Sequence, residues 1–156
     1  MKVLVMSDTH GDVRRAFIAL SLAEPVDIVI HLGDGSADAE LLRESLDIPV
    51  ISIAGNCDSG SRAPREQLWE CEGKRILLTH GDAYQVKSGL GRLQLRAVEL
   101  GAAAVLFGHT HHGVLENHTG ILFVNPGALA HAAHRRSFAV LNITLDGITS
   151  RHYDID

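Results

Sequence analysis

Five segments of the chain each end an apolar run with side chains that can bind a metal ion. Every one places an aspartate, an asparagine or a histidine next to or near a glycine, and the seven candidate ligands are Asp8, His10, Asp34, Asn56, His80, His109 and His111. Oxygen and imidazole donors suit Mn²⁺, Fe, Zn²⁺ or Mg²⁺ better than a soft metal. Seven donors are too many for one tetrahedral ion. They suit two ions that share a bridging carboxylate, the arrangement used for in-line displacement at phosphorus.

The apolar runs before these ligands predict buried strands that must bring the ligands together. Residues 3–6 are apolar on both faces, as in a strand covered on both sides, and residues 27–32, 49–54, 74–79 and 103–107 follow the same pattern. Amphipathic segments at 13–23, 37–46 and 90–100 predict helices between them. This rhythm favours parallel βαβ units, whose carboxyl ends build the sites of open α/β sheets. The glycines are expected to let the backbone turn sharply off each strand.

The remaining strands lack helices between them and predict antiparallel pairing late in the chain. Residues 67–71 and 74–79 are expected to form a hairpin through Glu72-Gly73. Further strands are predicted at 113–118, 121–125, 137–145 and 148–155, with Asp146-Gly147 as a two-residue turn. We expect an α/β fold in one domain over residues 1–156, since no linker or repeat appears.

Composition narrows the class of protein. The formal net charge is −5, and no basic cluster is longer than Arg135-Arg136, which argues against binding long nucleic acid. No apolar run is long enough to cross a membrane, and Met1 leads into a core strand without the pattern of a signal peptide. With only Cys57 and Cys71, we expect a cytoplasmic protein with reduced thiols.

The ordered motifs DTH, GD, GN, HG and GHTH resemble those of the calcineurin-like metallophosphoesterases. Cys57-Asp58 after GN, and NPGA at residues 125–128, are most similar to the small bacterial and archaeal phosphodiesterases (YfcE-like), a group related to the Vps29 scaffold of retromer. The resemblance covers nearly the whole chain. It implies a four-layer α-β-β-α sandwich of two mixed sheets, with a metal-dependent phosphodiesterase site at the strand ends.

The resemblance also implies which residues bind which ion. One metal would be held by Asp8, His10, Asp34 and His111, and the other by Asp34, Asn56, His80 and His109, so that Asp34 bridges. A hydroxide between the ions would attack a small phosphodiester in line. Manganese ranks first among the divalent ions, with nickel, zinc, iron and magnesium as alternatives.

Asn56, His10 and Cys57 are the candidate catalytic residues. Asn56 would stabilise charge on the phosphoryl oxygens. Most of the superfamily has a histidine at the position of Cys57, which resembles a general acid oriented by the acidic residue that follows it. A thiol suits that role poorly, which favours substrates with good leaving groups. The alternative interpretation of Cys57 is a cysteine that packs in the fold or supports the metal ligands from behind, without taking part in the reaction.

Other polar residues have structural interpretations. His31 is predicted to be a hydrogen-bonded core histidine, and Asp12 a helix N-cap. Asp38 could either support the site or act as a helix N-terminal acid. Asn125 could brace the site loops or form a turn. Trp69 could pack internally or contact another copy in a homo-oligomer.

The alternative function is a non-catalytic, Vps29-like scaffold that binds proteins. A scaffold has no reason to retain every ligand, whereas all seven positions here hold competent donors. A nuclease would need a basic groove, and the sequence shows none.

Overall fold

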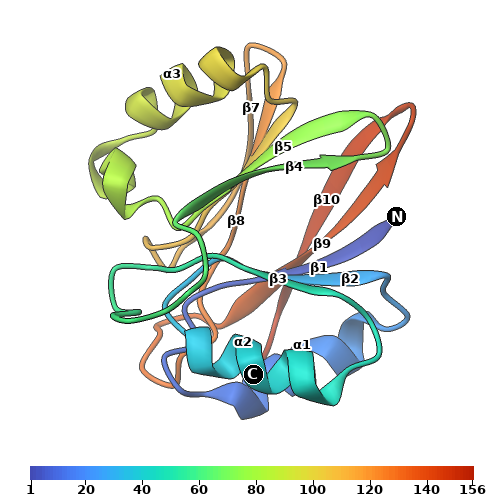
Figure 1. Ribbon diagram of the computed structural model, residues 1–156, viewed down its shortest axis with the longest axis vertical. Helices are drawn as coiled ribbons and strands as arrows, with labels where there is room; N and C mark the ends of the chain where they lie inside the picture. The colour runs from blue at the N-terminus through green and yellow to red at the C-terminus, as the bar shows by residue number, and fades with distance from the viewer.

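Two β-sheets pack face to face in the computed structural model, which describes residues 1–156, and helices cover both outer faces (Figure 1). The elements in chain order are β1 (Lys2–Met6), α1 (Val13–Ala23), β2 (Ile28–His31), α2 (Ser36–Ser45), β3 (Val50–Ser52), β4 (Glu66–Cys71), β5 (Lys74–Thr79), the 3₁₀ turns η1 (Asp82–Tyr84) and η2 (Val86–Ser88), α3 (Gly91–Leu100), β6 (Ala104–Leu106), β7 (Gly113–His118), β8 (Ile121–Pro126), β9 (Ser137–Thr144) and β10 (Gly147–Asp154). The predicted four-layer α/β sandwich is confirmed.

Each sheet is mixed and contains three neighbouring parallel strands. The first has the order β10-β9-β1-β2-β3, in which β1, β2 and β3 run parallel, β9 is antiparallel to β1, and β10 is antiparallel to β9. The second has the order β4-β5-β6-β8-β7, with β5, β6 and β8 parallel and antiparallel strands at both edges. The late strands therefore divide between the sheets: β7 and β8 complete the second, and β9 and β10 the first.

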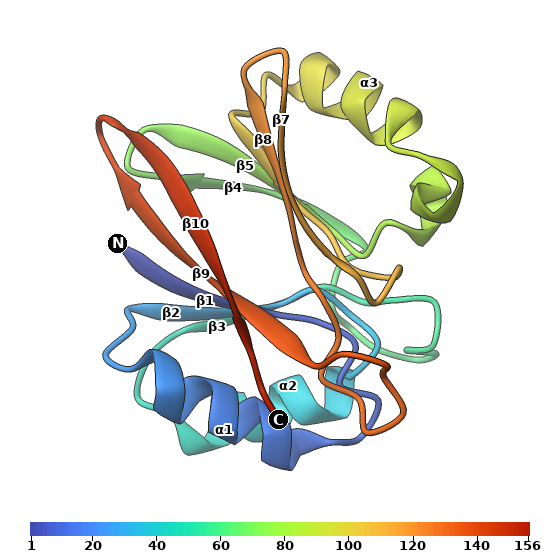
Figure 2. The ribbon, with the colours of Figure 1, turned by 180° about the vertical axis from the view of Figure 1, so that it is seen from behind.

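Alternating side chains in the central strands supply two apolar layers at once. Val3 and Val5 point into the core between the sheets, whereas Leu4 and Met6 pack toward α1 and α2. In the second sheet Leu77 packs with the α3 side, whereas its neighbours Ile76 and Leu78 face the first sheet. The view from behind shows α1 and α2 on the outside of one sheet and α3 on the outside of the other (Figure 2). Strands buried on both faces explain the continuous apolar runs in the sequence.

The carboxyl ends of the parallel strands from both sheets meet at one end of the sandwich. The loop after β1 bonds to the loop after β2 through Asp8 N and Gly33 O at 2.9 Å. The loop after β6 bonds to the loop after β5 through Gly108 N and His80 O, also at 2.9 Å. Within each sheet, these backbone bonds join two neighbouring ligand-bearing loops.

Most predicted boundaries differ from the observed ones by no more than one residue, and two differences have a clear cause. β3 ends at Ser52 and not at residue 54, because Ala54 N bonds to Pro64 O and leaves the ladder. The β9–β10 turn is centred on Leu145-Asp146, since Gly147 already pairs with Thr144. The Thr144 hydroxyl accepts a hydrogen bond from Asp146 N at 3.2 Å and stabilises that register. The Glu72-Gly73 turn is confirmed, with both residues at positive φ.

No helix of the structure combines the length and apolar character needed to cross a membrane.

Candidate metal centre

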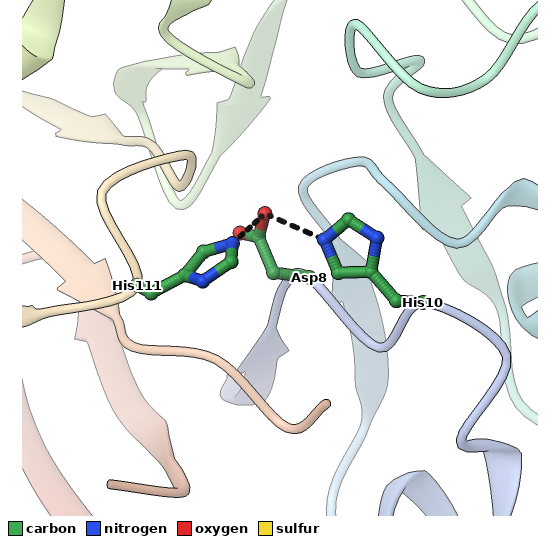
Figure 3. Close-up of side chains that lie close together, drawn as sticks. All are labelled: Asp8, His10 and His111. Atoms are coloured by element: carbon green, nitrogen blue, oxygen red, sulfur yellow. Dashed lines mark hydrogen bonds and ion pairs between the residues drawn. The ribbon is translucent and has the colours of Figure 1, made fainter. Parts of the chain in front are cut away.

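Asp8 lies at the end of β1 with one carboxylate oxygen held by the protein and the other facing histidines. Oδ2 accepts hydrogen bonds from Ser7 Oγ at 2.5 Å and from His109 N at 3.1 Å. Oδ1 lies 3.1 Å from His111 Nε2 and 3.6 Å from His10 Nε2, and the two rings approach it from opposite sides (Figure 3). Asp8, His10 and His111, here called the Asp8 group, place their ligand atoms within 4.8 Å of one another.

Asp34, which follows β2, is arranged in the same way. Its Oδ1 accepts a hydrogen bond from Cys57 N at 2.9 Å. Its Oδ2 lies 3.3 Å from His80 Nε2 and 3.7 Å from His10 Nε2. Asp34, His80 and His109, here called the Asp34 group, also place their ligand atoms within 4.8 Å of one another.

His80 joins the two groups from the second sheet. It is fully buried, and its Nδ1 lies 2.8 Å from Leu32 O. A carbonyl can only accept, so Nδ1 donates and Nε2 is the nitrogen left to bind an ion. Nε2 lies 3.3 Å from Asp34 Oδ2, 3.9 Å from Asp8 Oδ1 and 3.2 Å from His109 Nδ1. Six of the seven predicted ligands thus converge on a small volume.

The sharp turns at the strand ends are made by the candidate ligands themselves. Five of them have left-handed backbones, namely Asp8, His10, Asp34, His109 and His111, with φ between 45° and 71°. Each such residue costs about 1–3 kcal/mol, and such conformations cluster at functional sites. The expectation that the glycines supply these turns was incomplete. Gly55 and Gly108 have no positive φ, and their role is to let loops approach closely.

Close approach leaves no room for a side chain at these two glycines. A Cβ on Gly55 would lie 2.2 Å from Asp34 Oδ1 and 2.6 Å from Asp34 N. A Cβ on Gly108 would lie 2.1 Å from Ser7 Oγ and 2.8 Å from Asp8 Oδ2. Each glycine therefore sets how closely one of the two carboxylates approaches the neighbouring loop.

The charges at the centre favour ionised carboxylates. Burial alone would raise the pKa of Asp8, but the hydrogen bond from His111 and the charge of His80 outweigh it, and the pKa is lowered. The pKa of Asp34 is also held well below its ordinary value, because His80 and Cys57 N outweigh burial. Burial opposes a charge on His80, yet the two carboxylates raise its pKa. Negative charge concentrated among imidazoles is the environment that a cation requires.

Asp58 clamps the loop of Asp34. Its Oδ2 accepts from Asp34 N at 2.7 Å and from Gly55 N at 2.8 Å, and its Oδ1 accepts from Gly35 N and Ser36 N at 3.0 Å each. These backbone donors lower the pKa of Asp58 against the opposing effect of burial. The resemblance implied that this residue orients its neighbour at position 57. Instead it binds four backbone amides, a role that no local signal in the sequence indicates.

A second buried network supports the loop of Asp8. Thr9 Oγ1 donates to Asp38 Oδ2 at 2.5 Å and lies 2.9 Å from His31 Nε2, and Gly11 N also donates to Asp38 at 2.9 Å. His31 is the predicted core histidine, and Asp38 has the supporting role that the sequence left open. Burial lowers the pKa of His31.

Two further predictions are settled by side-chain contacts. Asn125 both braces the loop of His109 and forms a turn. Its Nδ2 donates to Gly108 O and Thr110 Oγ1 at 3.0 Å each, and its Oδ1 accepts from Gly127 N. Asp12 caps α1, as predicted, by accepting from Arg15 N.

Asn56 and Cys57 lie at the open side of the centre. Both are exposed, and Asn56 Nδ2 lies 3.5 Å from Cys57 Sγ. The Asn56 side chain makes no hydrogen bond to any of the other six predicted ligands. The interpretation of Cys57 as a packed cysteine was wrong, because the residue is exposed, whereas its N–H supports a candidate ligand by donating to Asp34 Oδ1. A cleft of about 220 Å³ lies here, lined by His10, Asp34, Cys57 and the start of α2.

The donor set fits divalent metal ions. Two ionised carboxylates and four imidazoles converge, and each carboxylate has one oxygen occupied by backbone donors while the other faces the histidines. The family model of the calcineurin-like phosphoesterase superfamily domain matches residues 1–146. The chain belongs to this superfamily.

The names of proteins with similar sequences agree with membership of this superfamily. The chain is 36% identical to the probable metallophosphoesterase YsnB of Bacillus subtilis, over 99% of this chain and 91% of that protein. It is 30% identical to phosphodiesterase MJ0936 of Methanocaldococcus jannaschii, over 81% of this chain and 83% of that one. Its fold is similar to that of Vps29 from Entamoeba histolytica complexed with zinc, with a TM-score of 0.79, 22% identity and 99% coverage of both chains.

Proposed function

We propose that this metallophosphoesterase is a phosphodiesterase that hydrolyses small phosphodiesters. It would bind two divalent ions, one at the Asp8 group and one at the Asp34 group. The observation that carries the proposal is the convergence of the Asp8 group and the Asp34 group on two ionised carboxylates whose free oxygens face the same histidines. The relative MJ0936, a named phosphodiesterase, supports the choice of a diester.

The candidate ligands divide between two positions. Asp8, His10 and His111 would hold one ion, and His80, His109 and Asn56 the other, with Asp34 between them. His10 Nε2 lies within 3.7 Å of an oxygen of both carboxylates, so its ring stands where the two ion positions adjoin. When bound, the ions would supply an activated water for in-line attack and would neutralise charge on the phosphoryl oxygens.

The residues at the open side would meet the substrate. The Asn56 amide is exposed beside the cleft, where its N–H groups can donate to a phosphoryl oxygen while Oδ1 faces an ion. Partial desolvation at the edge of the centre and the nearby Asp34 carboxylate raise the pKa of the Cys57 thiol, which makes it a poor proton donor to a leaving group. The site is therefore suited to diesters with stable leaving groups. If Cys57→Ala left the hydrolysis of every diester unchanged, proton donation by this thiol would be excluded.

The test is a metal screen on metal-stripped protein. An aryl phosphodiester and an aryl phosphomonoester would be supplied with Mn²⁺, Ni²⁺, Zn²⁺ or Mg²⁺ in turn. We expect no hydrolysis without metal, the highest rate with Mn²⁺, and faster cleavage of the diester. Asp34→Asn should lose both bound metal and activity, whereas Asp47→Asn, at an exposed position, should lose neither.

Two results would contradict the proposal. Full activity and full metal content in Asp34→Asn would overturn the bridging role of Asp34. Hydrolysis with none of the metals would favour a non-catalytic scaffold, the alternative to which the similarity in fold to Vps29 points.

A further inference from the structure

Cys57 brings a sulfur donor to the open side of the candidate metal centre. We propose that its thiolate is a metal ligand that binds, together with His10 and Asp34, the ion of the Asp8 group. The inference rests on the proposed metal centre and deepens it, because it assigns an eighth ligand and a different donor chemistry. The superfamily resemblance implied a general acid, and no ligand, at this position.

The spacing of the three side chains carries the proposal. The ligand atoms of His10, Asp34 and Cys57 all lie within 4.8 Å of one another. Ion-to-ligand distances are roughly 2.0–2.1 Å for imidazole nitrogen and roughly 2.3 Å for thiolate sulfur, so a nitrogen and a sulfur bound to one ion lie at most about 4.4 Å apart, close to the upper bound on these three atoms. His10 also belongs to the Asp8 group. One ion near His10 could therefore be reached by the sulfur as well.

The backbone holds Cys57 in this place. Its N–H donates to Asp34 Oδ1 at 2.9 Å, and the next residue, Asp58, accepts from both Asp34 N and Gly55 N. The loop after β3 is thereby tied to the loop that carries Asp34. The position of the sulfur thus depends on the same bonds that position the carboxylate.

The thiol of Cys57 has no other structural task. It is exposed, Asn56 Nδ2 lies 3.5 Å from its Sγ, and its other polar neighbours are the ligand atoms of His10 and Asp34. Cys71 provides the comparison within the same chain, because its side chain is buried in β4 and belongs to the core between the sheets. A cysteine that serves packing is placed like Cys71, whereas Cys57 faces the cleft.

A sulfur ligand changes which ions the centre prefers. On binding, the thiol releases its proton to solvent and the thiolate donates to the ion. Thiolate favours Zn²⁺, Co²⁺ and Ni²⁺ over the hard ions Mg²⁺ and Mn²⁺. Cys57→Ser should therefore weaken Zn²⁺ binding by about 10–100-fold and change Mn²⁺ binding much less. A thiolate bound to an ion has no proton to give to a leaving group. This agrees with a preference for diesters whose leaving groups need no proton.

Cobalt spectroscopy tests the proposal without any substrate. Metal-stripped protein is titrated with Co²⁺, bound cobalt is measured by elemental analysis, and the near-ultraviolet thiolate-to-cobalt charge-transfer absorption is recorded. We expect this absorption in the wild type, its retention in Cys71→Ser and its loss in Cys57→Ser. In Cys71→Ser, where Cys57 is the sole thiol, Co²⁺ should also protect it from alkylation by iodoacetamide.

The outcomes separate this inference from the proposed function. Stoichiometric cobalt without the absorption, or absorption that persists in Cys57→Ser, would overturn the thiolate ligand. If the wild-type protein still hydrolysed a diester in a metal-dependent way, the phosphodiesterase proposal would stand. If no cobalt bound at all and no metal supported hydrolysis, both would fail. Since Cys57 is exposed, Cys57→Ser is expected to fold, and the alkylation experiment does not depend on that variant.

Discussion

The two halves of the candidate centre differ in how deeply they lie in the protein. In the Asp34 group the His80 side chain is 0% exposed, and its second nitrogen bonds to the backbone carbonyl of Leu32. In the Asp8 group the carboxylate is buried, but the side chains of His10 and His111 are 33% and 41% exposed. One half is therefore arranged by the protein in advance, whereas the other faces the solvent from which a substrate arrives.

This difference indicates in which half of the centre the fold holds the ligand side chains more rigidly. Buried ligands with a fixed hydrogen-bond partner keep their orientation without an ion, and their replacement leaves unsatisfied groups in the interior. Exposed histidine rings can rotate and form hydrogen bonds with water in place of these partners. Substitutions in matched pairs, one in each half, should therefore give unequal effects.

The largest difference is expected between His80→Asn and His111→Asn. His80→Asn removes Nε2, the nitrogen left to bind an ion, together with part of a fully buried ring, so we expect metal affinity to fall by about 100-fold or more and stability by about 1–3 kcal/mol. His111→Asn should lower metal affinity by about 10-fold, with little change in stability. Calorimetric metal titration and urea denaturation measure the two quantities. Equal losses of metal affinity and stability in both variants would contradict the difference between the two halves of the centre.

The next pair is Gly55→Ala and Gly108→Ala. A Cβ at position 55 meets the backbone of Asp34, which cannot yield, whereas a Cβ at 108 first meets the Ser7 hydroxyl, which can rotate away. We expect Gly55→Ala to cost about 2–3 kcal/mol and Gly108→Ala about 1 kcal/mol, from thermal denaturation. Gly91→Ala is the control, because a Cβ there meets nothing within 4 Å and the residue begins a helix. A harmless Gly55→Ala would show that the loop of Asp34 is not tightly held.

A smaller effect is expected from the supporting carboxylates. Asp58 uses both oxygens as acceptors, so Asp58→Asn turns an NH₂ group toward backbone N–H donors. Asp38 uses Oδ2 for both of its bonds, and an asparagine could reproduce them. Asp58→Asn should lower metal affinity by about 10-fold, and Asp38→Asn by less than about 3-fold. The same metal titration checks both, and a larger loss in Asp38→Asn would contradict this assignment.

The smallest effect concerns pH and His31. Burial lowers the pKa of His31, so below roughly pH 6.5 the unfolded chain binds a proton that the folded chain does not, and stability falls as the pH falls. His31→Gln should remove this contribution, which is at most about 1.4 kcal/mol per pH unit. Urea denaturation at pH 7.5 and 5.5 measures it, with His131→Gln, at an exposed position, as the control. Identical pH dependence in His31→Gln and the wild type would show that His31 does not resist protonation.

Local patterns predicted most of the fold because each pattern has a local cause. Apolar runs identified the central strands, and the change from strand–helix units to consecutive strands indicated two mixed sheets. The errors arose where one particular hydrogen bond or strand pairing decided the boundary of an element. β3 is shortened by Pro64 O, and the last turn is placed by pairing between Gly147 and Thr144. No periodicity reports such contacts.

The sequence by itself determined the fold class, the family and the set of seven donors, because residue type and position at strand ends are local facts. That these donors bind ions stays a prediction. Only the tertiary structure decided that six of them meet, that five adopt left-handed backbones, and that Cys57 is exposed beside His10 and Asp34. The physical reason is that these features depend on distances between loops from separate strands, and only packing of the two sheets sets those distances.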